Sequence, residues 1–249
     1  MESLVQGGIT PVNIKNNECS KSLLNNLFFC LQPIIRNGDD SNINEYELLL
    51  RRKKDQKFPE VEFEYLSQNN NRNELLMAWS YREIQKFLEL NTQCLLWINI
   101  NPQQLSFNST YLFLKSLKKF RKNIKIEITE QIPDKGVDKS TSLSCIRKIR
   151  EMEYEVAIDD IGMGLNTLSF VLENITQISR LKLSLVSLRL LNQEELILLI
   201  KFWKLVANEA KLELVVEGID SEELRVLVSN IGITMQQGFL WENEFKYLY

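Results

Sequence analysis

Short apolar runs recur along the chain at regular intervals, and most of them are rich in Ile, Leu and Val. Runs of this length and composition are typical of β-strands that are buried on both faces. They lie at residues 30–36, 46–53, 94–100, 124–130, 155–161, 180–186, 212–218 and 234–239. The pattern therefore predicts about eight strands.

Between these runs, apolar residues repeat at intervals of three and four, which is the spacing of one helix face. The spacing predicts helices at residues 74–90, 109–120, 142–152, 194–210 and 221–231. Alternating strands and helices favour a parallel sheet, and about eight strands close a (β/α)₈ barrel. We therefore predict an α/β fold of the TIM-barrel type.

The chain shows no stretch with the composition of a domain linker, so we expect one barrel domain over residues 21–249. Residues 1–20 are polar and contain Gly7 and Gly8, which favours a flexible N-terminal segment. The asparagine-rich stretch at residues 67–74 is expected to form an exposed loop.

Composition limits the partners and the location of the protein. Apolar residues make up 44% of the chain and charged residues 25%, as in an ordinary globular protein. A net charge of −3 gives no general attraction to a nucleic-acid polymer or to an anionic membrane. The N-terminus lacks the features of a signal peptide, and no continuous apolar run approaches the ~18 residues of a membrane span. We expect a cytoplasmic protein.

The absence of histidine excludes several kinds of site. Without imidazole there is no Ser-His-Asp triad, no Cys-His pair and no histidine-bound metal. The four cysteines are far apart and show no C-x-x-C spacing, so neither a zinc site nor a disulfide framework is indicated. Hydrolytic chemistry would have to depend on carboxylates, lysine or hard cations bound through oxygen.

Polar residues lie within or at the ends of the predicted strands, one or two in each. They are Glu47, Asn99, Glu127, Asp159, Asp160, Lys182, Glu217 and Gln237. In a barrel of parallel strands, the carboxyl ends of all strands meet at one rim. We therefore expect these side chains to converge on one pocket although they span most of the chain.

Five carboxylates beside one lysine cannot all remain ionised without further positive charge. Oxygen ligands of this kind suit Mg²⁺ or Mn²⁺. The adjacent pair Asp159 and Asp160 could serve two ions, one carboxylate bridging them, as in two-metal hydrolases that act on phosphodiesters.

Each of these residues also has a simpler interpretation. An isolated Asp-Asp pair at a strand end is more often a turn or a helix cap than a ligand pair. The glycines at 162 and 164 are consistent with a plain exit from a strand. The basic stretch at residues 114–123 is expected to cover a helix surface rather than to bind nucleic acid. A metal site is favoured because all of the polar residues named above lie within or at the ends of predicted strands.

The chain resembles the EAL domain family, bacterial phosphodiesterases that cleave cyclic di-GMP, from about residue 28 to residue 239. Its segments "LQPIIR" and "YELLLR" resemble the opening motifs of the family, with leucine in place of the usual alanine in the second. Further matches follow in the family's order: "INPQQL" after Asn99, "IEITE", "IDDIGMG", "LKL", "VVEGID" and "QGF".

The resemblance implies a role for each matching residue. One metal ion would be bound by Glu47, Asn99, Glu127 and Asp159. The second would be bound by Asp160 and Glu217, with Asp159 bridging the two. Lys182 matches the lysine that orients the attacking water, so the implied catalytic residues are Lys182, Glu217 and Glu47. Glu130 matches a glutamate that steadies the loop after the Asp-Asp strand. The residues implied to touch the dinucleotide are Gln32, Arg51 and Gln237.

The resemblance also implies a barrel with an antiparallel first strand, a homodimer, and hydrolysis of cyclic di-GMP to linear pGpG. Departures from the family pattern favour a second reading. Ser184 replaces an aspartate two residues after the lysine, Asp220 replaces a glutamate, Thr234 replaces an aspartate, and the loop at residues 162–168 differs. The alternative is an inactive module that binds cyclic di-GMP or a protein partner. Metal-dependent action on another phosphodiester is also compatible with the residues alone.

Overall fold

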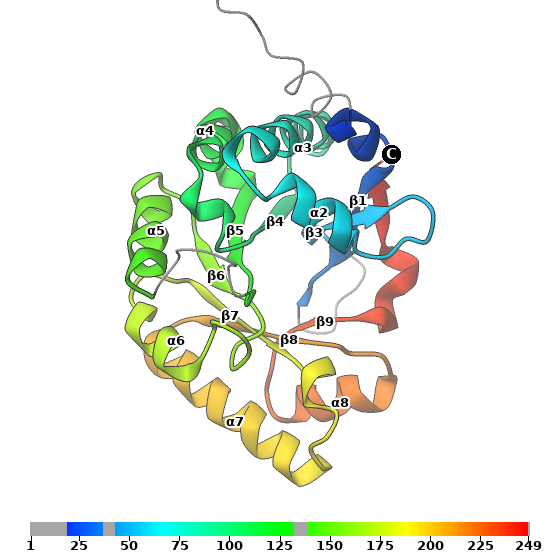
Figure 1. Ribbon diagram of the computed structural model, residues 1–249. Helices are drawn as coiled ribbons and strands as arrows, with labels where there is room; N and C mark the ends of the chain where they lie inside the picture. The colour runs from blue at the N-terminus through cyan, green and yellow to red at the C-terminus, as the bar shows by residue number, and fades with distance from the viewer. Residues whose placement is uncertain (1–18, 37–42, 132–138, 249) are drawn as a thin grey trace, which may run out of the picture.

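A single curled sheet forms the centre of the molecule. The structure is a computed structural model that describes residues 19–36, 43–131 and 139–248. In this part of the chain the strand order is β10-β1-β3-β4-β5-β6-β7-β8-β9-β2. Figure 1 shows the strands arranged around a central axis with the helices outside them. The predicted flexible segment 1–20 lies almost wholly outside the described residues and stays a prediction.

The predicted strands are all present, and they run as β1 (Leu27–Pro33), β2 (Ile35–Arg36), β3 (Glu45–Arg52), β4 (Leu95–Ile100), β5 (Ile124–Ile128), β6 (Val156–Ile158), β7 (Arg180–Ser184), β8 (Glu213–Glu217) and β9 (Met235–Gln237). Neighbours from β3 to β9 are parallel. The first strand is antiparallel, as expected: β1 pairs with β3 and β2 with β9. Because only Ile34 separates β1 from β2, this one segment joins both ends of the sheet and closes the barrel. An extra strand, β10 (Lys246–Leu248), pairs with β1.

The five predicted helices are confirmed with small shifts at their ends. They are α3 (Asn70–Leu90), α4 (Asn108–Ser116), α5 (Lys139–Glu151), α7 (Gln193–Ala210) and α8 (Glu222–Asn230). Two further helices, α2 (Glu60–Leu66) and α6 (Leu168–Asn174), have seven residues each, too short for a clear helical period, and residues 19–24 are also helical. Short 3₁₀ turns complete the chain at η1 (Gln104–Ser106), η2 (Leu117–Asn123), η3 (Val186–Leu188) and η4 (Phe239–Glu244). None of the described helices is long and apolar enough to cross a bilayer.

The expected loop at residues 67–74 is wrong, because α3 begins inside it. Asn69 caps this helix by accepting a hydrogen bond from the backbone N–H of Arg72 at 3.1 Å. Asn73 is fully buried and its amide donates to Ser109 Oγ at 2.8 Å and to Thr110 Oγ1 at 2.9 Å. Asparagine therefore suits the start of α3, since it either caps the helix or has buried partners.

The barrel interior is filled in layers, because alternate residues of each strand point inward. Arg180 and Glu45 lie in the layer at the amino ends of the strands. Above them is an apolar layer made by Ile34, Trp97, Ala157, Val215 and Met235. Two residues after Trp97, Ala157, Val215 and Met235 come the predicted site residues Asn99, Asp159, Glu217 and Gln237, and two residues after Glu45 and Arg180 come Glu47 and Lys182. The apolar layer separates the site from the opposite end of the barrel.

Candidate active site

Lys182 is the centre of the charged cluster at the carboxyl ends of the strands. It is fully buried, and its Nζ lies 2.9 Å from Glu47 Oε2, 2.5 Å from Glu217 Oε1 and 3.4 Å from Asp159 Oδ1. It also contacts Glu127 Oε1. Strands β3, β5, β7 and β8 each contribute one of these side chains, and Asp159 directly follows β6. The structure thus brings together five of the residues that the sequence predicts for the site.

The amide residues of the predicted site are grouped around Glu47. Asn99 donates to Glu47 Oε1 at 2.7 Å, and Gln237 donates to Glu47 Oε2 at 2.6 Å. Gln237 also donates to Gln32 Oε1 at 3.1 Å. The register accounts for Gln32, which is paired with Glu47 on β3.

A second acidic group lies at the end of β6. Carboxylate oxygens of Glu130, Asp159 and Asp160 all lie within 4.8 Å of one another. Asp160 has a φ of 42°, in the left-handed region that aspartate tolerates better than most residues. This turn places Asp160 beside Asp159, whereas successive residues of a regular strand point to opposite faces.

The loop after β6 is held mainly through backbone groups. The carbonyl of Glu130 accepts a hydrogen bond from the N–H of Leu165 at 2.9 Å. Gly164 approaches so closely that a Cβ there would lie 2.0 Å from the same carbonyl oxygen. Asn166 is fully buried and donates to the carbonyl of Asp159 at 2.5 Å. Asn166 was not among the predicted site residues; its place in the divergent loop, shortly after the Asp-Asp pair, was the only available signal.

Burial and mutual repulsion change the acidity of the carboxylates. Burial raises the pKa of Glu127 well above its ordinary value, and repulsion from Glu47 adds to this effect. At Glu217, burial raises the pKa and attraction to Lys182 lowers it. The effect of burial is the larger, so the pKa of Glu217 is raised well above its ordinary value. At Glu47 the effect of burial is outweighed by Lys182 and by hydrogen bonds from Asn99 and Gln237, so its pKa is lowered.

Asp160 has a pKa of about 6, raised first by burial and then by repulsion from Asp159 and Glu130. A hydrogen bond with the Ser184 side chain opposes this rise. Ser184, which the sequence marks as a departure from the family pattern, therefore supports the second acidic group. Lys182 does not depend on a carboxylate at position 184, because four others surround it.

The residues present fit hard divalent cations. Every donor in the cluster except Lys182 is a carboxylate or an amide. Asn99 Oδ1, Glu127 Oε2 and Asp160 Oδ1 are buried and have no hydrogen-bond partner among the described residues. One lysine cannot balance the surrounding carboxylates, and burial makes the excess charge costly. Oxygen ligands with uncompensated negative charge are the environment that Mg²⁺ and Mn²⁺ prefer.

Arg51 lies apart from the charged cluster. Its guanidinium donates to the carbonyl of Leu50 at 3.0 Å, and the residue lines a cavity that also reaches Glu47, Asn99 and Asp159. The structure therefore places Arg51 at the edge of the same cleft, without a direct contact to the acidic residues.

Comparison with solved structures gives the same architecture. An EAL domain protein from Listeria monocytogenes superposes with a TM-score of 0.70 at 19% identity, over 95% of this chain and 94% of that chain. The FimX EAL domain from Pseudomonas aeruginosa, bound to c-di-GMP, gives 0.69 at 20% identity over 92% and 94%. The Klebsiella pneumoniae protein BlrP1, in a manganese and cyclic di-GMP complex, gives 0.67 at 20% identity over 86% and 55%.

No curated protein sequence is a significant match to this chain. The sequence profile of one family matches residues 16–244, which include every residue of the acidic cluster. That family is described as the EAL domain. This match covers most of the chain, and the barrel agrees with it. The protein therefore belongs to the EAL domain family.

Proposed function

We propose that this protein hydrolyses cyclic di-GMP to linear pGpG with two divalent ions, Mg²⁺ or Mn²⁺. The observation that carries the proposal is the arrangement around Lys182: the five carboxylates that match metal ligands of the family lie in two acidic groups, and Asn99 is hydrogen-bonded to Glu47 in the first of them. Structures of family members with c-di-GMP, one of them also with manganese, support this substrate and cofactor.

The residues of the site would have different roles according to their positions. Glu47, Asn99, Glu127 and Asp159 would hold one ion, and Asp159, Asp160 and Glu217 the other. Two such ions supply charge stabilisation for an in-line displacement at phosphorus. Lys182 would orient the attacking water and stabilise the charge that develops on the phosphate oxygens. Water adds to phosphorus, one ring P–O bond breaks, and the leaving oxygen takes up a proton.

Binding of the dinucleotide is assigned to the rim of the cleft. Gln32 and Gln237 are hydrogen-bonded to each other and present amide groups beside Glu47. Arg51 offers a guanidinium that suits a phosphate. We place this activity in the cytoplasm; Cys19, Cys30, Cys94 and Cys145 are all free thiols, as is usual in a reducing compartment.

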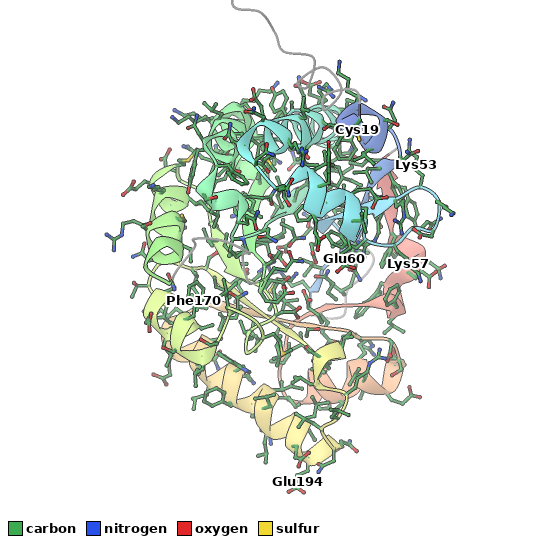
Figure 2. The ribbon with its side chains drawn as sticks, in the orientation of Figure 1. Cys19, Lys53, Lys57, Glu60, Phe170 and Glu194 are labelled. Carbon is green, nitrogen blue, oxygen red and sulfur yellow. The ribbon has the colours of Figure 1, made fainter. Side chains whose placement is uncertain are left out.

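The homodimer is proposed on the outer face of α7. Leu198, Phe202 and Leu205 lie three or four residues apart on this helix and are 61%, 41% and 60% exposed. An apolar stripe of this kind on a surface helix marks an interaction site. Figure 2 places Glu194, at the start of α7, at the periphery of the molecule, so a second copy could reach the helix. Phe202→Glu should convert a dimer into a monomer in light scattering; an unchanged mass would exclude this face.

The alternative is a module that binds cyclic di-GMP or a protein partner without cleaving the nucleotide. The divergent loop at residues 162–168 supports it, since Met163 and Leu168 are exposed there. The deciding experiment incubates the protein with cyclic di-GMP in Mg²⁺ or Mn²⁺ and separates the nucleotides by chromatography. Formation of pGpG by the native protein and not by Glu47→Gln would establish the enzyme. Binding by calorimetry without product would establish the module.

A further inference from the structure

A cavity of about 230 Å³ connects the metal-ligand cluster with the space between the barrel and its helices. One end reaches Glu47, Asn99 and Asp159. The other end lies between β1, β3 and β4 on one side and α2, α3 and α4 on the other. Its apolar lining is formed mainly by Phe29, Leu50, Phe63, Met77, Ile98 and Phe113.

The cavity passes through a split in the sheet. Pairing between β3 and β4 stops at Leu48 and Ile98, although β3 continues to Arg52 and β4 to Ile100. Residues 49–52 of β3 pair with β1 alone. The two strands therefore diverge just above the site, and the barrel interior opens toward the helix layer at this point.

Two polar residues of the cavity wall, Arg51 and Thr129, have few hydrogen-bond partners among the described residues. Arg51 forms no ion pair with a carboxylate of the described residues, and its hydrogen bond to the Leu50 carbonyl occupies only one donor. Thr129 Oγ1, on the wall of the cavity, is buried and without a hydrogen-bond partner among the described residues. A cation and a hydroxyl at the entrance to an apolar space suit an anion with an apolar tail.

We propose that this cavity binds a medium-chain carboxylate, with the tail between α3 and the barrel and the head group at Arg51. A dry apolar cavity of about 150 Å³ is large enough to bind benzene, so the larger space here suits a chain of about eight carbons. Binding does not depend on hydrolysis of cyclic di-GMP. Because Arg51 is also proposed to contact the dinucleotide, the carboxylate is expected to compete with it.

Calorimetric titration of the full chain with octanoate tests the proposal without any activity measurement. Ser80 lines the apolar end from α3, so Ser80→Leu fills the cavity and should weaken octanoate binding about tenfold or more. The matched control is Ala78→Leu, on the exposed side of the same helix, which should bind as the native protein does. Equal binding by native protein and a folded Ser80→Leu variant would overturn the proposal, as would no binding at about 1 mM octanoate.

A second variant tests the head group and does not alter the packing of α3. Arg51→Gln removes the charge, so octanoate should bind about tenfold more weakly while octanol binds unchanged. Equal loss of both ligands, or of neither, would contradict the placement of the carboxylate at Arg51. If GMP, and not octanoate, loses affinity in Ser80→Leu, the cavity holds a nucleobase and the proposal is wrong.

Discussion

At the scale of single residues, Lys182 is the group on which the site depends most. Four carboxylates surround its ammonium group in a fully buried position. These acidic groups raise its pKa well above the ordinary value although burial alone lowers it. Lys182 is therefore charged at neutral pH, and it acts as a cation at the centre of the cluster.

Removal of this cation should destabilise the protein strongly when no metal is present. Lys182→Met leaves buried carboxylates uncompensated, so we expect a loss of about 3–5 kcal/mol in the free energy of unfolding in EDTA. Mn²⁺ should restore more stability to this variant than to the native protein, because it replaces part of the missing charge. Urea unfolding with and without Mn²⁺ measures both effects. Lys201→Met, an exposed change on α7, is the control and should cost less than about 0.5 kcal/mol.

In catalysis, Lys182→Ala should lower kcat far more than it weakens binding of cyclic di-GMP. The reason is that an orienting cation acts mainly on the transition state. Steady-state kinetics and calorimetry of the same variant give the two quantities. A parallel loss of both would mean that Lys182 only binds the ligand.

The thiols are expected to differ sharply in reactivity. Burial raises the pKa of Cys30 to about 11, a rise that Arg51 opposes, so Cys30 is almost entirely a neutral thiol at pH 8. Cys94 and Cys145 are also buried, whereas Cys19 is exposed at the outer surface (Figure 2). Iodoacetamide at pH 8 should therefore modify Cys19 alone, as measured by mass spectrometry of the intact protein. Cys19→Ser should abolish this labelling. Rapid modification of Cys30 in the folded protein would contradict the prediction, because it would mean that β1 separates from its neighbours and exposes the thiol to solvent.

At the scale of elements, α3 shows how polar residues can specify a helix. Asn73 bonds Ser109 and Thr110 at the start of α4, and its carbonyl oxygen accepts from Gln104 at 2.8 Å. Gln104 in turn accepts from the backbone N–H of Asn101, two residues after Asn99. This buried network joins α3, η1 and α4 and fixes the loop that follows β4.

Asn73→Leu should therefore cost about 3 kcal/mol of unfolding free energy, because several buried polar groups lose their partners at once. The matched control is Asn71→Leu, an exposed position on the same helix, for which a change within about 0.5 kcal/mol is expected. Chemical denaturation measures both. Equal effects of the two substitutions would show that the network contributes nothing specific to stability.

At the scale of the whole molecule, the two ends of the barrel carry different charged groups. At the amino ends, Arg180 pairs with Glu45 and with Glu213, each at 2.6 Å, and lies over the ring of Trp97 at 4.1 Å. Arg36 of β2 joins the same group through Glu213 at 2.9 Å. These contacts connect β2, β3, β4, β7 and β8 across the barrel, below the apolar layer.

We expect Arg180→Met to destabilise the fold by about 3–5 kcal/mol, since the buried Glu45 would lose its partner at 2.6 Å and keep only the more distant and half-exposed Arg36 at 3.4 Å. Arg189→Met, at an exposed position, is the control and should have little effect. Thermal unfolding in EDTA tests this contribution separately from metal binding. The double variant Arg180→Met with Glu45→Gln should recover part of the loss; a further decrease would contradict the ion-pair explanation.

The sequence alone determined the strand and helix order, because the alternation of apolar runs with helical periods is local and repeats along the chain. It also determined which residues gather at the rim, since the carboxyl ends of parallel strands share one edge. Only the tertiary structure decided the features that depend on distant contacts: the helical state of the asparagine-rich segment, the Ser184 support of Asp160, the Arg180 cluster and the split between β3 and β4. Each arises from side chains or strand registers separated along the chain, and local periodicity carries no information about such partners.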